Sequence, residues 1–360
     1  PSYPSSLLFN LTQPLLRNYG TEVARVQINI AKNAAWIERY VFVDRVLQTV
    51  AQVEQTYWEL VFARENAQVA KATMKAAQEL MASNQAKVKA GILAQVDVLQ
   101  AQAAVASRVE GVLIAQKGIR DQEDQLRQLF SASEDELRDT VVIVPLDRPT
   151  AIKDPTIPKQ AIDTALHQRP EVLQAQKRIE SREFDTQLAK NQLLPSLDFQ
   201  GSLGLGGLGN GVRDTYGRNF NGEFYNMGAG MVLSYPLGNR SAESQFRRRQ
   251  LEASQAQASL VNVRQQVIVN VKEAVRRVST NFKRIETTRV ARKLALRQLK
   301  AEQVRLNVGL STTRAVLEDQ GDLAVARANE LRAVVDYNQA LSNLRRSQAT
   351  TLDRYGITLE

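Results

Sequence analysis

The sequence predicts a mainly helical protein that repeats one unit twice, and each unit consists of a β-strand, a long helix, a tight tip and a return helix. Three observations predict this fold class. Glycine and proline are both absent from residues 21–90 and again from residues 241–308. Apolar residues recur in these segments at helical spacing, whereas residues 196–237 alternate with the period of a strand. The ends of the two long segments also resemble each other in sequence, which indicates an internal duplication.

Residues 1–16 are predicted to form the strand of the first repeat, because apolar Leu7, Phe9 and Leu11 alternate with polar residues. Residues 17–130 are predicted to form a helical hairpin. At 1.5 Å per residue, its descending helix over residues 21–90 would be roughly 105 Å long. Its apolar stripe has heptad spacing and consists of Val43, Val46, Val50, Val53, Tyr57 and Leu60. The chain turns at Gly91 and returns to about Phe130 through a run rich in small residues, which let helices approach closely.

The middle of the chain separates the two repeats. Residues 131–158 contain four prolines and are predicted to be loop-like. Residues 159–194 are predicted to be helical, with Pro170 starting a new helix after Arg169. Residues 195–238 are predicted to form a β-hairpin around the glycine-rich segment 204–209. That segment has the formal pattern GxGxxG, but we expect a hairpin tip rather than a dinucleotide site, because a polar loop over residues 214–224 follows it instead of a helix.

Residues 239–348 are predicted to form the second hairpin, and residues 349–360 a C-terminal segment outside it. The descending stripe has a nearly straight helical period and consists of Leu260, Val263, Val267, Val271, Ala274, Val278, Phe282 and Ile285. The tips align at an offset of 218, since Gly91 matches Gly309 and Gln102 matches Gln320. The segments before the long helices align at Pro14 and Pro236. By this symmetry, we expect a helix and a strand to precede residue 1 in the complete protein, together with any secretory signal.

Composition excludes several classes of function. The 360 residues carry 47 basic and 38 acidic side chains, a net charge of +9. There is no cysteine and one histidine, His167, so we expect no disulfide, no metal site, no cofactor and no enzyme. The basic runs at residues 247–249 and 345–346 have no interleaved aromatic residues, which argues against nucleic-acid binding. No uninterrupted run of 18 apolar residues occurs, so no transmembrane helix is expected.

The alternating strands are compatible with a soluble sandwich or with an outer-membrane barrel. Three strands cannot close a barrel, and a hairpin about 100 Å long cannot bury its stripe alone. Identical copies of the chain are therefore expected to complete both parts. The alternative is an elongated soluble coiled-coil scaffold without channel activity, which would need no detergent for extraction.

Four segments together resemble the TolC family of outer-membrane channel-tunnel proteins. They are the duplicated tips at residues 90–93 and 308–311, VDVLQAQ at 96–102, HQRPEV at 167–172 and LLPSLDFQGS at 193–202. The resemblance implies a homotrimer in which four strands per chain form a 12-stranded outer-membrane β-barrel, continued by a periplasmic barrel of α-helical hairpins. An equatorial region would include residues 131–158 and 349–360. The implied function is a passive exit duct for efflux or type I secretion, embedded in outer-membrane lipid and joined to a periplasmic adaptor protein and an inner-membrane transporter.

The resemblance also implies two groups of site residues. The adaptor would dock on the tips, at Gly91, Ile92, Leu93, Val308, Gly309, Leu310 and Ser311. A gate at the same end would use Asp97 and Glu318, with Arg314 four residues before Glu318 to neutralise part of its charge. Ala315 departs from the family pattern, which has an aspartate there. Three copies of each carboxylate around an axis would repel one another, so we expect the ring to bind cations or to stay partly protonated. The alternative for Asp97 and Glu318 is an ordinary solvated helix charge.

Overall fold

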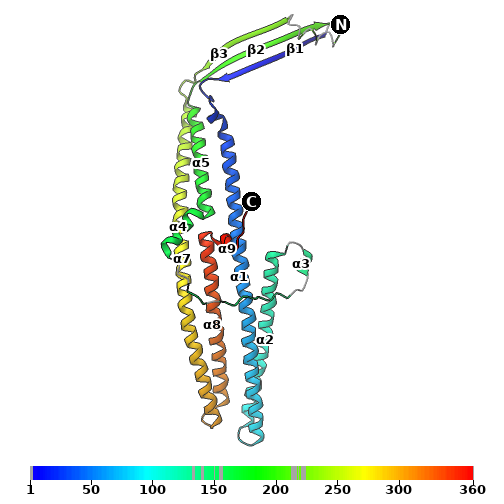
Figure 1. Ribbon diagram of the computed structural model, residues 1–360, viewed down its shortest axis with the longest axis vertical. Coiled ribbons are helices and arrows are strands. Elements are labelled where there is room, and N and C mark those ends of the chain that lie inside the picture. The colour runs from blue at the N-terminus through cyan, green and yellow to red at the C-terminus, as the bar shows by residue number, and fades with distance from the viewer. Residues whose placement is uncertain are drawn as a thin grey trace. The chain divides into compact units, whose positions relative to one another are not determined.

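The computed structural model describes residues 3–131, 134–138, 142–149, 151–153, 157–211, 217, 219 and 224–359 (Figure 1). The chain divides into two compact units, and the long helices α1 (Thr21–Lys89) and α7 (Arg240–Asn307) contribute residues to both. Unit 1 contains Pro1–Val41 and Glu171–Val263, and unit 2 contains Phe42–Pro170 and Arg264–Glu360. The two uninterrupted helices confirm what the absence of glycine and proline predicted.

Unit 1 contains an antiparallel sheet in the order β1 (Tyr3–Pro14), β2 (Ser196–Gly209) and β3 (Phe224–Ser234). Its register lines up apolar rows across the strands, such as Phe9, Leu203 and Met227. Small and polar rows alternate with them on the opposite face, such as Asn10, Ser202 and Gly228. Every residue of β3 is exposed. The sheet therefore presents an apolar face that no other described part of the chain covers.

The glycine-rich segment was wrongly predicted to be a hairpin tip. Residues 204–209 lie inside β2, where they pair with β1 on one side, and residues 204–206 also pair with β3 on the other. Backbone hydrogen bonding to two neighbouring strands overrides the weak strand propensity of glycine. The polar loop expected over residues 214–224 lies mostly outside the described residues.

The helical part of unit 1 places α5 (Pro170–Asn191) between the N-terminal portions of α1 and α7. Gln187 Nε2 donates to Glu22 Oε2 of α1 at 3.4 Å, and Thr186 Oγ1 donates to the Arg249 carbonyl of α7 at 3.2 Å. The predicted break before α5 is confirmed, because α4 (Pro158–Gln168) ends at Arg169, whose ψ is 127°. A proline disfavours the helical conformation of the residue before it.

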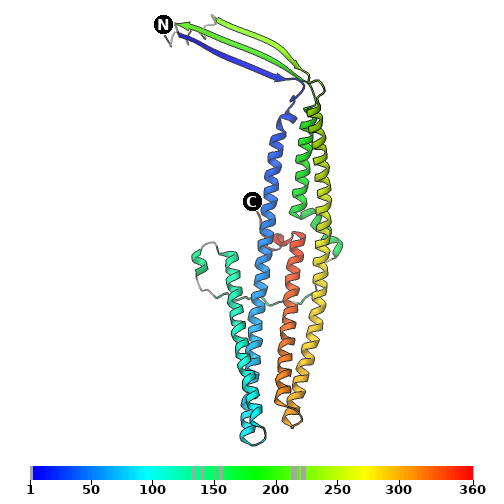
Figure 2. The ribbon, with the colours of Figure 1, turned by 180° about the vertical axis from the view of Figure 1, so that it is seen from behind.

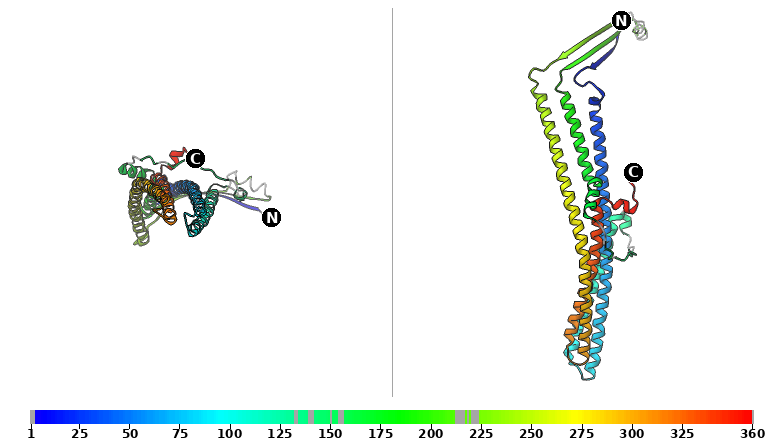
Figure 3. Two further views of the ribbon diagram at one scale, coloured as in Figure 1. Left: turned by 90° about the horizontal axis from the view of Figure 1, so that it is seen from below. Right: turned by 60° about the vertical axis from the view of Figure 1, so that its left-hand side comes forward.

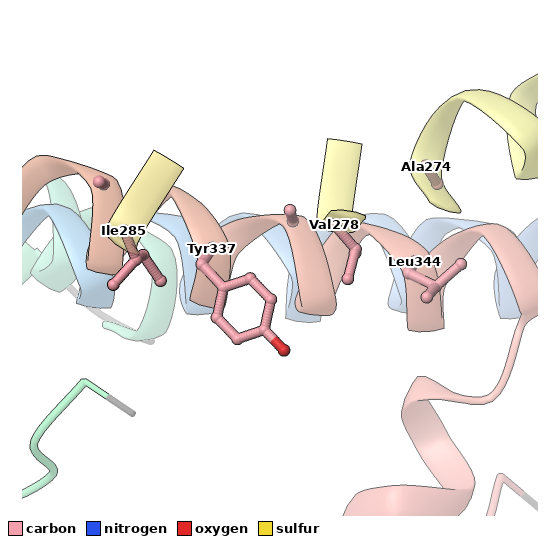
Figure 4. Close-up of a cluster of buried hydrophobic side chains, with 7 residues drawn as sticks. Ala274, Val278, Ile285, Tyr337 and Leu344 are labelled. Carbon is pink, nitrogen blue, oxygen red and sulfur yellow. The ribbon is translucent and has the colours of Figure 1, made fainter. Parts of the chain in front are cut away.

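Unit 2 contains two hairpins, α1 with α2 (Gln95–Phe130) and α7 with α8 (Thr313–Gln348). Side-chain contacts link α7 to α8, α8 to α1 and α1 to α2, and α8 also approaches α2. A buried cluster joins α7 to α8, and Figure 4 shows Val278 and Ile285 beside Tyr337, which is fully buried. Arg332 Nη1 of α8 lies 2.7 Å from Glu59 Oε2 of α1, and Arg64 Nη2 of α1 lies 2.7 Å from Glu123 Oε1 of α2.

The two predicted stripes differ in outcome. Most of the α7 stripe is confirmed, since Val267, Val271, Ala274, Val278 and Ile285 are buried, while Leu260, Val263 and Phe282 are half-buried. The α1 stripe is only partly right. Leu60 is buried, but the other predicted positions are half-buried, and the buried neighbours on the helix are Leu47 and Ala51. Helix α1 contacts elements on several sides, so no single heptad line marks its buried surface.

An extended strap, described over residues 142–149 and 151–153, lies against the hairpins of unit 2 (Figure 2). Tyr57 of α1 donates a hydrogen bond to Asp147 Oδ2 at 2.9 Å, and the Tyr337 hydroxyl of α8 donates to the Ile152 carbonyl. The C-terminal helix α9 (Thr351–Tyr355) is fastened by a hydrogen bond from the Tyr355 hydroxyl to Glu54 of α1. Partial burial of the phenol and this hydrogen bond raise the pKa of Tyr355 to about 12. The short helices α3 (Glu134–Arg138) and α9 were not predicted, because one turn of helix leaves no periodic signal.

Helix α2 bears on the expectation that the chain has no transmembrane helix. Among the described helices it alone is long and apolar enough to cross a membrane by length and composition, with a mean hydropathy of 1.2 over its best 18-residue window. This 18-residue segment reaches that hydropathy without an unbroken apolar run, because it is rich in alanine and valine and contains at most two charged residues. The same composition suits a helix that packs closely on its neighbours.

Candidate functional site

The two hairpin tips have the same backbone structure, and both lie at one end of unit 2 (Figure 3). At the first tip, Gly91 N–H bonds to the Val88 carbonyl at 2.9 Å and Ile92 N–H bonds to the Lys87 carbonyl at 2.8 Å. At the second, Gly309 N–H bonds to Leu306 and Leu310 N–H to Arg305, at 3.3 and 2.8 Å. This pattern is the Schellman motif, which needs a left-handed residue, and the φ values of Gly91 and Gly309 are 73° and 78°. The duplication found in the sequence therefore extends to the turn geometry.

A buried asparagine connects the starts of the two return helices. Asn84 of α1 is fully buried, as is Thr313 at the start of α8. The Asn84 Nδ2 atom donates to Thr313 Oγ1 at 2.9 Å and to the Asp97 carbonyl of α2 at 3.4 Å. One side chain thus bridges α1, α2 and α8 just above the tips.

Two further contacts join the hairpins on either side of Asn84. Gln320 Nε2 of α8 donates to the Ala76 carbonyl of α1 at 3.5 Å. Nearer the tips, Lys87 Nζ donates to Asn307 Oδ1 at 3.2 Å. Hydrogen bonds therefore connect the two hairpins of one chain along the last turns of α1.

The predicted gate residues lie near the starts of the return helices. Asp97 lies in the first turn of α2 and is half-exposed. Arg314 Nε donates to Glu318 Oε1 at 2.9 Å, so the expected ion pair is present, and both side chains are exposed. The backbone of Asp97 is connected through Asn84 to Thr313, the neighbour of Arg314.

The predicted docking residues differ in exposure. Ile92, Val308 and Leu310 are 70%, 64% and 79% exposed, which makes the tips unusually apolar for solvent-facing turns. Leu93 is half-buried. The Ser311 hydroxyl bonds to Glu302 within its own tip, and Glu302 also pairs with Arg305 at 3.2 Å.

Asn84 and Thr313 were missed by the sequence analysis. The sequence could have indicated Asn84 as a polar residue on the buried face of α1. Ala77 and Asn84 are two helical turns apart, and both are fully buried. A buried polar residue at such a position usually has a hydrogen-bond partner.

A comparison with protein families shows which family the chain belongs to. The profile of the outer membrane efflux protein family matches residues 5–131 and 161–350. The chain belongs to the outer membrane efflux protein family. Family membership places it among outer membrane proteins that are not enzymes, in agreement with the sequence-based expectation.

One curated relative and several solved structures resemble this efflux protein. The pyoverdine export outer membrane protein OpmQ of Pseudomonas putida is 22% identical over 306 residues, which are 82% of this chain and 62% of the relative. The chain thus spans less than two thirds of the length of that relative. The outer membrane protein VceC of Vibrio cholerae aligns with a TM-score of 0.73 at 16% identity, over 97% of this chain and 87% of VceC. The open-state MtrE outer membrane channel of Neisseria gonorrhoeae aligns with a TM-score of 0.73 at 14% identity, over 97% of this chain and 81% of MtrE.

The structural likeness confirms the predicted fold class of the efflux protein. Channel-tunnel proteins combine long helical hairpins with outer-membrane strands, and the described elements follow the same order. The return helices α2 and α8 approach each other with Cα atoms within 8 Å. A Cβ atom added at Gly321 of α8 would lie 3.0 Å from Arg108 Nη2 of α2. The small residues of these two runs therefore permit the close packing that the sequence predicted.

Proposed function

We propose that three copies of this chain form a passive exit duct through the outer membrane, as part of a tripartite efflux or type I secretion system. The observation that carries the proposal is the apolar face of the β1–β2–β3 sheet, combined with edges on β1 and β3, since no described residue covers the face or pairs with the edges. Open strand edges are not stable in lipid, so neighbouring copies must pair with them. The domain boundaries expected from the sequence remain part of this proposal, with equatorial segments at residues 131–158 and 349–360.

The helical hairpins support the same arrangement. Helix α2 leaves Leu99, Leu113 and Ile114 exposed, and α7 leaves Val269, Val290 and Leu294 exposed. No described part of the chain covers these exposed faces of α2 and α7. A second copy that seats its α7 against α2 would cover both surfaces and continue the row of helices into a closed tube.

We infer that the tips are the regulated end of the duct. Asp97 and the Arg314–Glu318 pair would surround the opening, and apolar Ile92, Val308 and Leu310 would receive a periplasmic adaptor that connects to an inner-membrane transporter. Exposed apolar side chains on tight turns favour a protein partner over free solvent. The Pseudomonas relative is named for the export of pyoverdine. We assign export to this chain without a particular cargo.

Block of the channel by a trivalent cation tests the gate. Three Asp97 carboxylates near an axis would attract the cation, so wild-type single-channel currents should fall when it is added on the tip side. Asp97→Ala should remove the block, and Glu318→Gln should weaken it less because Arg314 already neutralises part of the Glu318 charge. Equal block in wild type and Asp97→Ala would remove Asp97 from the gate, while leaving the duct itself intact.

The alternative function is a soluble coiled-coil scaffold, which the exposed apolar sheet disfavours. Extraction distinguishes the two functions. The duct requires detergent for release from the outer-membrane fraction, whereas a scaffold would be released by buffer alone. Co-purification with an adaptor, lost on Leu310→Asp and retained on Ser311→Ala, would support docking at the tips.

A further inference from the structure

The three strand–helix junctions of unit 1 share one composition. They are residues 14–20, 190–195 and 235–240, which we call the junction collar. Each contains a proline, an asparagine, at least one leucine and one basic residue, and none contains an acidic residue. The basic residues are Arg17, Lys190 and Arg240. Two of these junctions are the duplicated segments around Pro14 and Pro236, so these two belong to the internal repeat.

Asparagine side chains hold the junctions together. The Asn18 N–H donates to Asn191 Oδ1 at 2.7 Å, and Gln192 Nε2 donates to Asn18 Oδ1 at 2.6 Å. Asn239 Nδ2 donates to the Leu193 carbonyl at 3.1 Å. Asn18 and Asn239 adopt positive φ values of 66° and 27°, which asparagine tolerates better than most residues. The junctions are thus fixed side by side at one end of the sheet, where the strand register pairs Ser196 with Ser234.

The collar exposes large amphipathic and apolar side chains next to its charges. Tyr19 and Tyr235 are 57% and 67% exposed, and Leu237 is 93% exposed on the turn formed with Gly238, whose φ is 77°. Tyrosine is enriched at membrane–water interfaces, where its ring lies among the headgroups. A leucine on a tight turn that makes almost no contact within its own chain is suited to insertion between lipids.

The basic side chains of the collar have no acidic partner within the part of the chain that the structure describes. One to three turns further along the helices, the pattern is different. Arg182 lies 3.3 Å from Asp185, and Arg248 and Arg249 lie 3.1 and 2.7 Å from Glu252. At the collar, by contrast, positive charges are available beside exposed apolar groups.

We propose that the junction collar binds the headgroups of anionic phospholipids at the periplasmic boundary of the outer membrane. The inference rests on the proposed placement of the sheet in the membrane, and it adds a specific lipid class. The basic side chains of the collar lie where the apolar face of the sheet ends, so they would meet the phosphate groups of the periplasmic leaflet. A headgroup with a net negative charge strengthens its attraction to these side chains. The tyrosines and Leu237 would enter the interface beside them.

A lipid titration of the detergent-solubilised full chain tests the proposal. Short-chain phosphatidylglycerol and short-chain phosphatidylcholine are added separately at low salt, and bound lipid is counted by native mass spectrometry. Wild type should bind phosphatidylglycerol more tightly than phosphatidylcholine. Each charge removed should weaken phosphatidylglycerol binding about fivefold. The triple variant Arg17→Gln/Lys190→Gln/Arg240→Gln should show no preference between the two lipids.

A matched control removes the same charge elsewhere. Lys293→Gln/Arg297→Gln/Lys300→Gln changes three exposed positions of α7 in unit 2 and should keep the wild-type preference. If the collar triple variant does not fold, the three single variants give the same test, each with a fivefold loss. An unchanged preference in the collar variants, or full competition by inorganic phosphate at equal concentration, would overturn the assignment. Because the readout is lipid binding, a channel that conducts normally yet shows no lipid preference would refute the collar alone.

Discussion

At the scale of single residues, two glycines set the geometry of the tips. Gly309 has a φ of 78° and open space where a Cβ would lie, so the cost of a side chain there is conformational rather than steric. Gly309→Ala should destabilise the fold by about 1 kcal/mol, because an L-residue is strained in the left-handed region. Thermal unfolding in detergent measures the change.

The control for that substitution is a glycine in regular helix. Gly118 of α2 also has open space around its Cβ position, but its backbone is helical. Gly118→Ala should leave stability unchanged or raise it by up to about 1 kcal/mol, because alanine favours the helix. An equal loss of stability in both variants would mean that the positive φ of Gly309 does not cause the effect of its substitution.

Asn84 is the residue whose loss should weaken the contact between the hairpins most. Asn84→Leu leaves the buried Thr313 hydroxyl without its donor and should cost about 2 kcal/mol. Replacing both partners, as in Asn84→Leu/Thr313→Val, should recover part of the loss, because no buried polar group is then stranded. Chemical unfolding of the single and double variants gives the coupling energy. Strictly additive effects would contradict a direct Asn84–Thr313 bond.

The tip residues also show what sequence can and cannot predict about the site. Gly91 and Gly309 were predictable because each ends a long glycine-free segment and they align in the repeat. Asn84 and Thr313 lie 229 residues apart, and no local pattern pairs them. The exposure of Leu310 and the occupied hydroxyl of Ser311 likewise depend on the folded tip.

At the scale of elements, a cluster of charges joins α5 to α7. Glu252 accepts hydrogen bonds from Arg249 and Arg248 of its own helix, and Arg182 of α5 lies 3.6 Å away. Asp185 of α5 in turn lies 3.9 Å from Arg249. The hydrogen bond from Arg249 is the main cause that holds the pKa of Glu252 below its usual value.

The lowered pKa of Glu252 predicts how the charge cluster between α5 and α7 responds to acid. A carboxyl whose folded pKa is lowered stabilises the fold above its unfolded pKa, and that contribution is lost as the pH falls through the folded value. Glu252→Gln should therefore lower the melting temperature at pH 7, and the difference from wild type should vanish in acid. Glu286→Gln, an exposed change on the same helix, is the control and should show no such pH dependence. A gap between wild type and Glu252→Gln that persists in acid would mean that charge is not the cause.

The helices with a long periodic pattern were predicted best. The segments whose structure depends on contacts with distant parts of the chain were predicted worst. The bounds of α2 and α8 match the predicted return runs at Phe130 and Gln348. The glycine-rich part of β2 was missed because its strand conformation comes from two neighbouring strands rather than from its own residues. The buried face of α1 was misjudged because several elements contact that helix, and a single stripe cannot describe them.

At the scale of the whole molecule, the proposed duct depends on surfaces that the described residues of one chain leave uncovered. The apolar face of the sheet, its two open edges and the outward sides of α2 and α7 are all features of a subunit. Family membership identifies the kind of protein, and the assembly into a duct is the step that we propose.

Single-channel recording of the purified full-length protein in a planar lipid bilayer tests that step most directly. We expect discrete conductance steps of uniform size, each from one assembly of identical chains with a continuous water-filled lumen. A folded protein that enters the bilayer yet never conducts, even when its tips are loosened by Asn84→Leu, would contradict the duct.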